Sequence, residues 1–205
     1  MKCHWLSMID DLERFEKGKR LFLHSCCAPC SSYVLEYLRE QFAITVFFYN
    51  PNITERKEYE LRCDEQKRLL ALTASLPSFC PPGFIEGAYD TGRFYEIAKG
   101  FELNAEGGER CSRCVTLRLQ ETARVAGELG FDYFATTLTV RPLKKAEKIN
   151  EIGLRIAKEM GGPVYLASDF KKKGGAGRSL ALSKTYSLYR QKFCGCAFSR
   201  RDTPN

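Results

Sequence analysis

The chain has 205 residues, of which 44% are hydrophobic and 28% charged, and its formal net charge is +7. This is the composition of an ordinary soluble globular protein. No apolar run approaches the roughly 20 residues that cross a bilayer. The N-terminus also lacks the apolar core of a signal peptide, so we expect a cytoplasmic protein rather than a membrane-spanning or secreted one.

Hydrophobic periodicity predicts strands that alternate with helices along the chain, and Ser31 or Ser32 is expected to cap the helix after the first strand. This order predicts a parallel, doubly wound α/β sheet with helices on both faces and a short C-terminal extension, built as a single domain over 1–205. In chain order the expected elements are a helix over 7–17, a strand over 20–25, a helix over 32–41, a strand over 43–49, a helix over 55–75, a strand over 84–87 and helices over 91–99 and 109–129. A strand with its edge loop over 131–138, a helix over 145–160, a strand over 164–166 and a short helix within 169–190 follow.

Three cysteines, Cys26, Cys27 and Cys30, directly follow the first predicted strand. In doubly wound folds the turn between a strand and the next helix is a common ligand site. This turn lacks the glycines that let a backbone approach phosphate closely, but it offers thiolates to a metal. We therefore expect a metal here, with Asn50 and Asn52 from the end of the second strand bordering the same crevice.

Seven of the ten cysteines fall into three groups, which are Cys26/Cys27/Cys30, Cys111/Cys114 and Cys194/Cys196. The other three, Cys3, Cys63 and Cys80, are scattered, as inert cysteines usually are. In a cytoplasmic protein such groups indicate an iron–sulfur cluster, a zinc site or a dithiol–disulfide relay, and the residues alone leave all three open. The Cys-Gly-Cys group can form an easily reduced disulfide or supply further ligands.

Positive charge is concentrated in the last third of the chain. Residues 141–205 carry 15 Lys and Arg against 5 Asp and Glu, whereas residues 1–140 carry 17 against 20. Aromatic residues such as Tyr186 and Tyr189 are interleaved with the basic ones. This pattern favours a nucleic-acid partner with an unstacked base, and the alternative is a basic surface that only meets solvent.

Five motifs together resemble one family, the cobalamin-independent epoxyqueuosine reductases of the QueH type. The resemblance covers nearly the whole chain in the right order, with no departure at the cysteines. The motifs are His-Ser-Cys-Cys-Ala-Pro-Cys-Ser-Ser at 24–32, Phe-Tyr-Asn-Pro-Asn-Ile at 48–53, Glu-Arg-Cys-Ser-Arg-Cys at 109–114, Phe-Asp-Tyr-Phe-Ala-Thr-Thr-Leu at 131–138 and Leu-Tyr-Arg-Gln-Lys-Phe-Cys-Gly-Cys at 188–196.

The resemblance implies an enzyme that reduces epoxyqueuosine to queuosine at the wobble position of a tRNA anticodon. It also implies an adenine-nucleotide α-hydrolase-like fold, related to PP-loop proteins, with a 4Fe-4S cluster and an additional metal ion, expected to be iron. The implied cluster ligands are Cys26, Cys27, Cys111 and Cys114, with Cys30 near the second metal. Cys194 and Cys196 are implied as a redox-active or auxiliary pair. The enzyme is expected to act as a monomer and to need an external electron donor.

Removing an epoxide oxygen also requires a proton donor, and the sequence offers Asp64, Asp169, Tyr186 and Tyr189 without deciding among them. Separately, Arg190 is expected to reach the active site, because it lies between Tyr189 and the Cys194/Cys196 pair. Two other functions stay open. One is a PP-loop enzyme that activates a tRNA base with ATP, weakened by the absence of a Ser-Gly-Gly-x-Asp-Ser turn, and the other is a zinc-stapled RNA-binding module without catalysis.

Overall fold

A computed structural model of the chain describes residues 12, 15–76, 80–142 and 144–202. Five strands form one sheet in the order β3-β2-β1-β4-β5, and every neighbouring pair is parallel. The elements are β1 (Lys19–His24), α2 (Ala28–Leu38), β2 (Phe42–Phe48), α3 (Arg56–Thr73), β3 (Gly83–Glu86), α4 (Thr91–Ala98), α5 (Glu109–Glu128), β4 (Tyr133–Thr136), the 3-10 helix η2 (Thr137–Val140), α6 (Ala146–Met160), β5 (Val164–Tyr165), α7 (Gly175–Thr185) and the 3-10 helix η3 (Ala197–Asp202).

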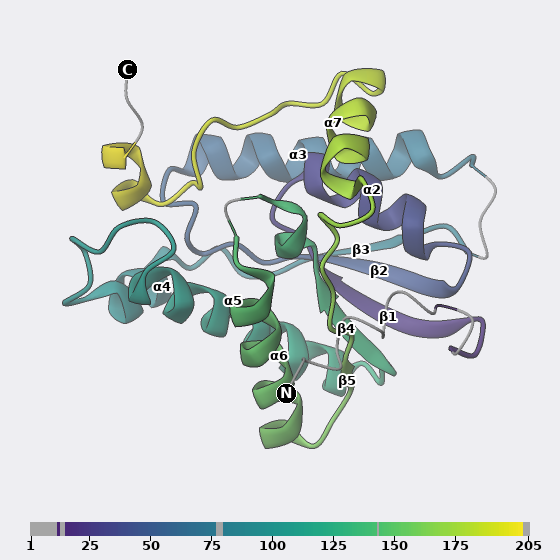
Figure 1. Ribbon diagram of the computed structural model, residues 1–205, viewed down its shortest axis with the longest axis horizontal. Helices are drawn as coiled ribbons and strands as arrows, with labels where there is room; N and C mark the ends of the chain where they lie inside the picture. The colour runs from purple at the N-terminus through teal and green to yellow at the C-terminus, as the bar shows by residue number, and fades with distance from the viewer. Residues whose placement is uncertain (1–11, 13–14, 77–79, 143, 203–205) are drawn as a thin grey trace.

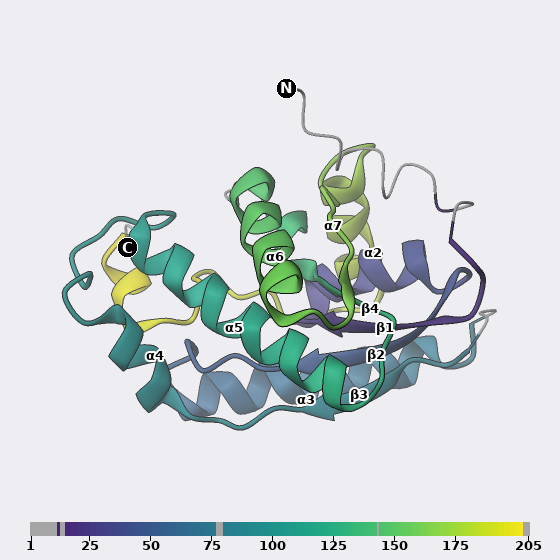
Figure 2. The same ribbon diagram turned by 90° about the horizontal axis from the view of Figure 1, so that it is seen from below.

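Helices cover both faces of the sheet, which confirms the doubly wound α/β fold. Helices α2, α3 and α7 lie on one face, and α4, α5 and α6 lie on the other (Figures 1 and 2). The strand order reverses between β1 and β4, which are paired through Leu21–His24 and Tyr133–Thr136. In such sheets ligands bind beyond the carboxyl ends of the strands at this switch point.

The core is centred on β1, whose Leu21, Phe22 and Leu23 have no exposed surface. A continuous apolar run is typical of a parallel strand that has helices on both sides. Phe22 stacks on Phe47 of β2, with ring centroids 4.9 Å apart. The core therefore fixes the carboxyl ends of β1 and β2 rigidly, and these ends carry the site described below.

Helix α2 begins at Ala28, four residues before the predicted start, and its N-cap residue is Cys27 rather than Ser31 or Ser32. Proline permits this start, because Pro29 occupies the first turn, where the N–H that proline lacks would have no intrahelical acceptor. Within the strand and edge loop predicted over 131–138, β4 ends at Thr136 and η2 follows. Of the helix predicted over 7–17, residues 7–11 and 13–14 lie outside the described residues, and residues 15–17 are not helical.

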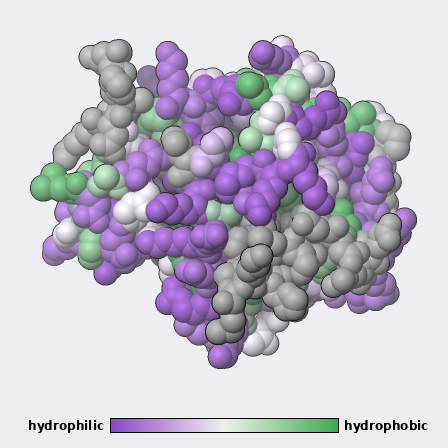
Figure 3. All heavy atoms as spheres, in the orientation of Figure 1, coloured by the Kyte–Doolittle hydropathy of each residue, from purple (hydrophilic) through white to green (hydrophobic). Residues whose placement is uncertain are grey.

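Hydrophilic side chains dominate the face of the molecule shown in Figure 3, where hydrophobic residues form only small separate groups. Within the described segments, no helix combines the length and apolar character needed to span a bilayer.

Candidate metal centre

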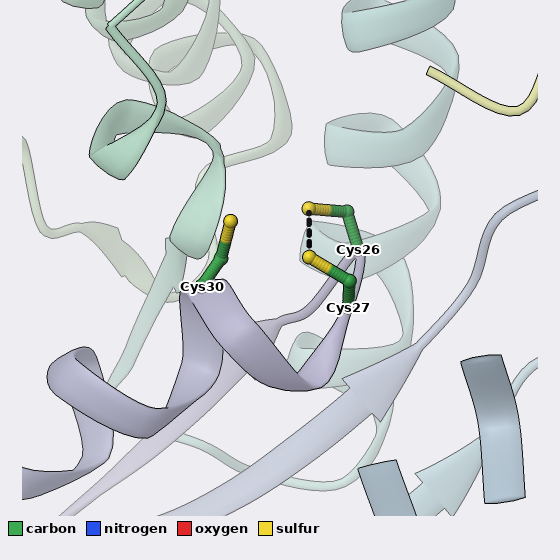
Figure 4. A group of neighbouring side chains, drawn as sticks. All are labelled: Cys26, Cys27 and Cys30. Atoms are coloured by element: carbon green, nitrogen blue, oxygen red, sulfur yellow. Dashed lines mark hydrogen bonds between the residues drawn. The ribbon is translucent and has the colours of Figure 1, made fainter. Parts of the chain in front are cut away.

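Three cysteine thiols meet between β1 and α2. The sulfur atoms of Cys26, Cys27 and Cys30 lie within 4.8 Å of one another, and the sulfurs of Cys26 and Cys27 are 3.7 Å apart. Figure 4 shows the three side chains beside one another at the start of α2. Two thiolates on one tetrahedral zinc ion, each at about 2.3 Å, would be about 3.8 Å apart. The spacing therefore suits thiolates that share a metal.

Hydrogen bonds between buried polar groups hold this turn in place. The hydroxyls of Ser25 and Ser31 both donate to Gln66 Oε1 on α3, at 2.7 and 2.8 Å. The backbone N–H of Cys26 donates to Thr137 Oγ1 at 3.5 Å, in η2 directly after β4. The turn is therefore held by α3 and η2 as well as by its own helix.

His24 anchors the site but is not free to bind a metal. Its Nδ1 lies 2.9 Å from Thr136 Oγ1, and its Nε2 lies 3.1 Å from the Tyr49 carbonyl oxygen. Burial and the nearby Arg118 charge lower the pKa of His24 to about 3, so the ring is neutral. Because a carbonyl only accepts, Nε2 carries the hydrogen and Nδ1 accepts from the threonine hydroxyl. Both nitrogens are thus engaged in joining β1 to its two neighbours.

The three clustered thiols favour a single negative charge when no metal is bound. Hydrogen bonds from Cys27 and Cys30 hold the pKa of Cys26 well below its usual range, and Arg118 and Arg141 act in the same direction. The hydrogen bond to Cys26 raises the pKa of Cys27 to about 12, and burial adds to the effect. A soft metal cation would take the place of the protons that Cys27 and Cys30 retain.

Cys111 and Cys114 lie in the first turns of α5 and stand outside the compact group. The Cys111 sulfur is partly exposed and accepts from the Gly107 N–H at 3.2 Å. Cys114 is buried, which raises the pKa of its thiol to about 11. The link to the first group is Arg118, whose guanidinium is close enough to interact electrostatically with Cys26, Cys111 and Cys114.

Cations, amides and the thiols of Cys26 and Cys194 line a small cavity. Its volume is about 10 Å³, close to the space of one water molecule. Both Asn50 and Asn52 border it, as predicted, and the Asn52 Oδ1 atom is buried without a hydrogen-bond partner among the described residues. The charged and thiol groups around this cavity are Cys26, Arg62, Arg118, Arg141, Lys144 and Cys194.

The C-terminal segment reaches this cavity and is held there by Arg62. From α3, the Arg62 guanidinium donates to the carbonyl oxygens of Phe193 at 3.3 Å and Cys194 at 3.0 Å. It also pairs with Glu58 at 2.6 Å. We call these contacts the Arg62 clamp. Gly195 follows with φ of +112°, a conformation that favours glycine.

The two cysteines of this segment have different surroundings. Cys194 borders the cavity, and its sulfur lies 4.0 Å from Lys144 Nζ. Cys196 is buried in an apolar cluster with Phe94, Ala98 and Cys114. Both thiols are free, so the disulfide that we considered between them is not formed.

An open pocket of about 500 Å³ borders the other side of the compact thiol group. Cys27 and Cys30 line it together with Arg141, Arg190 and Gln191. Its apolar walls are Val140, Pro142, Ala176 and Leu180. The Gln191 Oε1 atom is buried and has no hydrogen-bond partner within the described part of the chain. The size and mixed lining are those of a small-molecule site.

The remaining predicted residues have other partners. Asp64 is 78% exposed on α3. Asp169 pairs with Lys171 at 2.7 Å, and the Tyr189 hydroxyl donates to Glu58 at 3.0 Å. None of these three predicted proton donors borders the cavity or the open pocket. The transferable protons at the cavity therefore belong to other groups.

Three cations near the thiols are not apparent from the sequence. Arg141 and Lys144 belong to the basic region 141–205, which is expected to be a surface, but both interact electrostatically with the thiols. The third is Arg118, which the sequence pattern does not single out. A signal for Arg118 was present, because residues four apart lie on the same side of a helix and Cys114 is four residues earlier.

The thiols, the cations and the switch point define a class of protein, namely a doubly wound α/β protein with a buried cysteine centre suited to a soft metal. Comparison with protein families matches residues 21–202 to "Epoxyqueuosine reductase QueH". The chain belongs to this family and is thus an oxidoreductase.

Curated relatives described by the same name come from distant bacteria. The protein of Staphylococcus epidermidis is 38% identical over 194 residues, which are 94% of this chain and 81% of that protein. The protein of Acinetobacter baylyi is 40% identical over 92% of this chain and 84% of its own length. That of Thermotoga maritima is 32% identical over 87% and 89% respectively.

Proposed function

We propose that this protein reduces the epoxide of epoxyqueuosine in tRNA to the alkene of queuosine. The reaction takes up two electrons and two protons and releases the oxygen as water. The observation that carries the proposal is the buried group of Cys26, Cys27 and Cys30 beside an open pocket at the switch point. An enzyme that removes oxygen reductively needs a redox centre next to its substrate.

The cysteines suit a metal cofactor, because buried thiols with cationic neighbours are chemically matched to iron and other soft metals. In our proposal Cys26, Cys27, Cys111 and Cys114 hold a 4Fe-4S cluster, and Cys30 lies near an additional iron. When bound, such a centre supplies single electrons and a Lewis acid for the oxygen. Cys194 and Cys196 remain candidates for a redox-active pair.

The open pocket is the proposed site of the modified base, which has to leave the anticodon stack to reach the centre. The Arg141 and Arg190 guanidiniums can stack on or donate to the base, and Gln191 Oε1 is available to accept an N–H. Apolar walls such as Val140 and Leu180 exclude water around it. In this arrangement the polar groups orient the base, and the apolar walls limit the access of water to the reacting group.

Protons are proposed to come from groups that border the small cavity. Lys144 Nζ lies 4.0 Å from Cys194 Sγ, so an ammonium and a thiol stand side by side. Asp64, Asp169 and Tyr189 are less suitable because they have partners elsewhere. Lys144 would then restore the proton of Cys194 after each transfer.

The protein is proposed to be a cytoplasmic monomer that receives electrons from an external donor. Its residues 141–205 are proposed to face the tRNA. The basic residues of this region differ in exposure and in their partners. Arg178 pairs with Glu36 at 2.7 Å, whereas Lys172 and Lys173 are exposed. Phosphate contacts are therefore proposed for the exposed lysines, while Arg141 and Lys144 serve the site.

The test is an anaerobic assay of protein reconstituted with iron and sulfide, given a reductant and tRNA that contains epoxyqueuosine. Nucleoside mass spectrometry should show conversion to queuosine, and Cys27→Ala should abolish it together with the visible absorption of the centre. Cys63→Ala is the matched control, because this buried thiol packs against Phe48 and Tyr59 and lines neither the cavity nor the open pocket. A fully metal-loaded wild-type protein that leaves the epoxide intact would refute the proposal.

A further inference from the structure

Arg118 is a buried cation with only neutral hydrogen-bond partners. Its residue is 2% exposed. Its Nε donates to the Cys114 carbonyl oxygen at 3.3 Å, and its Nη1 donates to Asn50 Oδ1 at 3.4 Å. The Asn50 amide is itself fixed, because its nitrogen donates to the Ser25 carbonyl at 2.8 Å. A chain of contacts thus holds the guanidinium between the two thiol groups.

Among the described residues, no carboxylate pairs with Arg118 to balance its charge. Within the described residues Arg118 forms no ion pair, whereas the equally buried Arg62 pairs with Glu58 at 2.6 Å. Burying an unpaired charge is costly, so buried cations normally have an anionic partner. The groups that interact with Arg118 electrostatically are Cys26, Cys111, Cys114 and Cys194.

Two further cations lie beside the thiols. Arg141 lines the cavity together with Cys26 and the open pocket together with Cys30. Lys144 Nζ lies 4.0 Å from Cys194 Sγ, and Lys144 lines a surface pocket together with Cys111. Among the ion pairs of the described chain, one carboxylate serves these three cations, which is Glu106 at 3.5 Å from Lys144. The site is therefore built with an excess of positive charge.

We propose that Arg118 is a positioning residue that balances a net negative, thiolate-bound metal centre and raises its reduction potential. This inference rests on the proposed function, because it takes the cysteines as metal ligands. Reduction adds negative charge to the centre, so a fixed cation beside it stabilises the reduced form. The Arg118 charge also raises the metal affinity of the site, because it offsets the repulsion between neighbouring thiolates that are buried away from water.

The first measurement is metal affinity, by competition of the metal-free protein with a chromophoric chelator for Zn²⁺. Arg118→Met should bind 10–100-fold more weakly, the range for removing a group that supports metal ligands, and Arg118→Lys should recover most of the loss. Metal-induced thermal stabilisation should fall in parallel, by about 1.4 kcal/mol for each tenfold loss of affinity. The metal-free Arg118→Met protein should not lose stability to the same extent, because its unpaired charge is gone.

The second measurement is the reduction potential of protein reconstituted with iron and sulfide. Arg118→Met should have a more negative reduction potential, by about 59 mV if the substitution lowers the equilibrium constant for one-electron reduction tenfold. Arg124→Met is the control, since it removes the same charge from the same helix at an exposed position paired with Glu121. An unchanged affinity and potential in Arg118→Met would overturn the inference. A wild-type protein that binds neither Zn²⁺ nor reconstituted iron and sulfide would overturn the proposed metal site itself.

Discussion

The Arg62 clamp leads to a quantitative prediction about stability. In Arg62→Met, Glu58 loses its cationic partner at a place where the two side chains are only 2% and 11% exposed. Removing one partner of a buried ion pair costs about 3–5 kcal/mol. Glu58 keeps the hydrogen bond from the Tyr189 hydroxyl, so we expect the lower end, about 3 kcal/mol. That is a large fraction of the roughly 5–15 kcal/mol by which domains are stable.

Urea unfolding of the metal-free protein, followed by circular dichroism, measures this loss. Arg56→Met is the matched control, because Arg56 pairs with Glu60 at the same spacing on the same helix but is 71% exposed. Exposed pairs contribute about 0.2–1 kcal/mol, so this control should unfold close to the wild type. A double-mutant cycle with Glu58→Gln should give a coupling energy of about 1–3 kcal/mol between the two positions.

If Arg62→Met and Arg56→Met unfold at the same urea concentration, the buried pair does not hold the segment and the reasoning fails. Alkylation of Cys194 by iodoacetamide, read by mass spectrometry, gives an independent check. The thiol should react faster in Arg62→Met, because the carbonyl groups of Phe193 and Cys194 lose their donor.

Three further predictions follow from other parts of the fold. Neutralising Lys171–Lys173 should lower the salt dependence of tRNA binding by roughly 0.7–0.9 in log–log slope per lost phosphate contact, and raise KM with kcat nearly unchanged; an unaltered slope would place the tRNA elsewhere. Arg178 lowers the pKa of Glu36 below its ordinary value of 4.5, so their pair stabilises the fold above that pH and stops doing so as the pH falls through the lowered pKa; Arg178→Met should therefore lower the stability slightly at pH 7 and leave it unchanged in strong acid, by urea titration. Gly153→Ala should cost about 1–3 kcal/mol in the same assay, because a Cβ there would overlap the Tyr165 ring, and wild-type stability would show that the ring moves aside.

The parts of the fold that follow from local patterns could be read from the sequence. Strands β1 and β2 contain the apolar runs Leu21–Leu23 and Val46–Phe48, and Asp90 caps α4 by accepting from the Gly92 N–H at 3.0 Å. The start of α2 could not be read in this way, because Ser31 resembles a cap but is used to bind Gln66 of α3. A contact across 35 residues of sequence outweighed the local preference.

The sequence predicts which residue types form the site, but it does not predict how their side chains are arranged. The thiols and the two asparagines could be placed at the sheet edge, since parallel strands end together. Which charges face inward depends on packing between α5, the segment after η2 and the C-terminal segment. Lys144 belongs to a run of basic residues that reads as surface, yet its side chain is only 8% exposed.

The Arg62 clamp also implies an order of assembly. The sheet and the compact thiol group are complete once the chain has been made as far as β5, because all five strands and Cys26, Cys27 and Cys30 precede that point. Cys194, which borders the cavity, emerges from the ribosome some 30 residues later. Since domains fold progressively from the N-terminal side during synthesis, Cys26 is in place before Cys194 reaches the cavity, and under our proposal a metal could meet Cys26 in that interval.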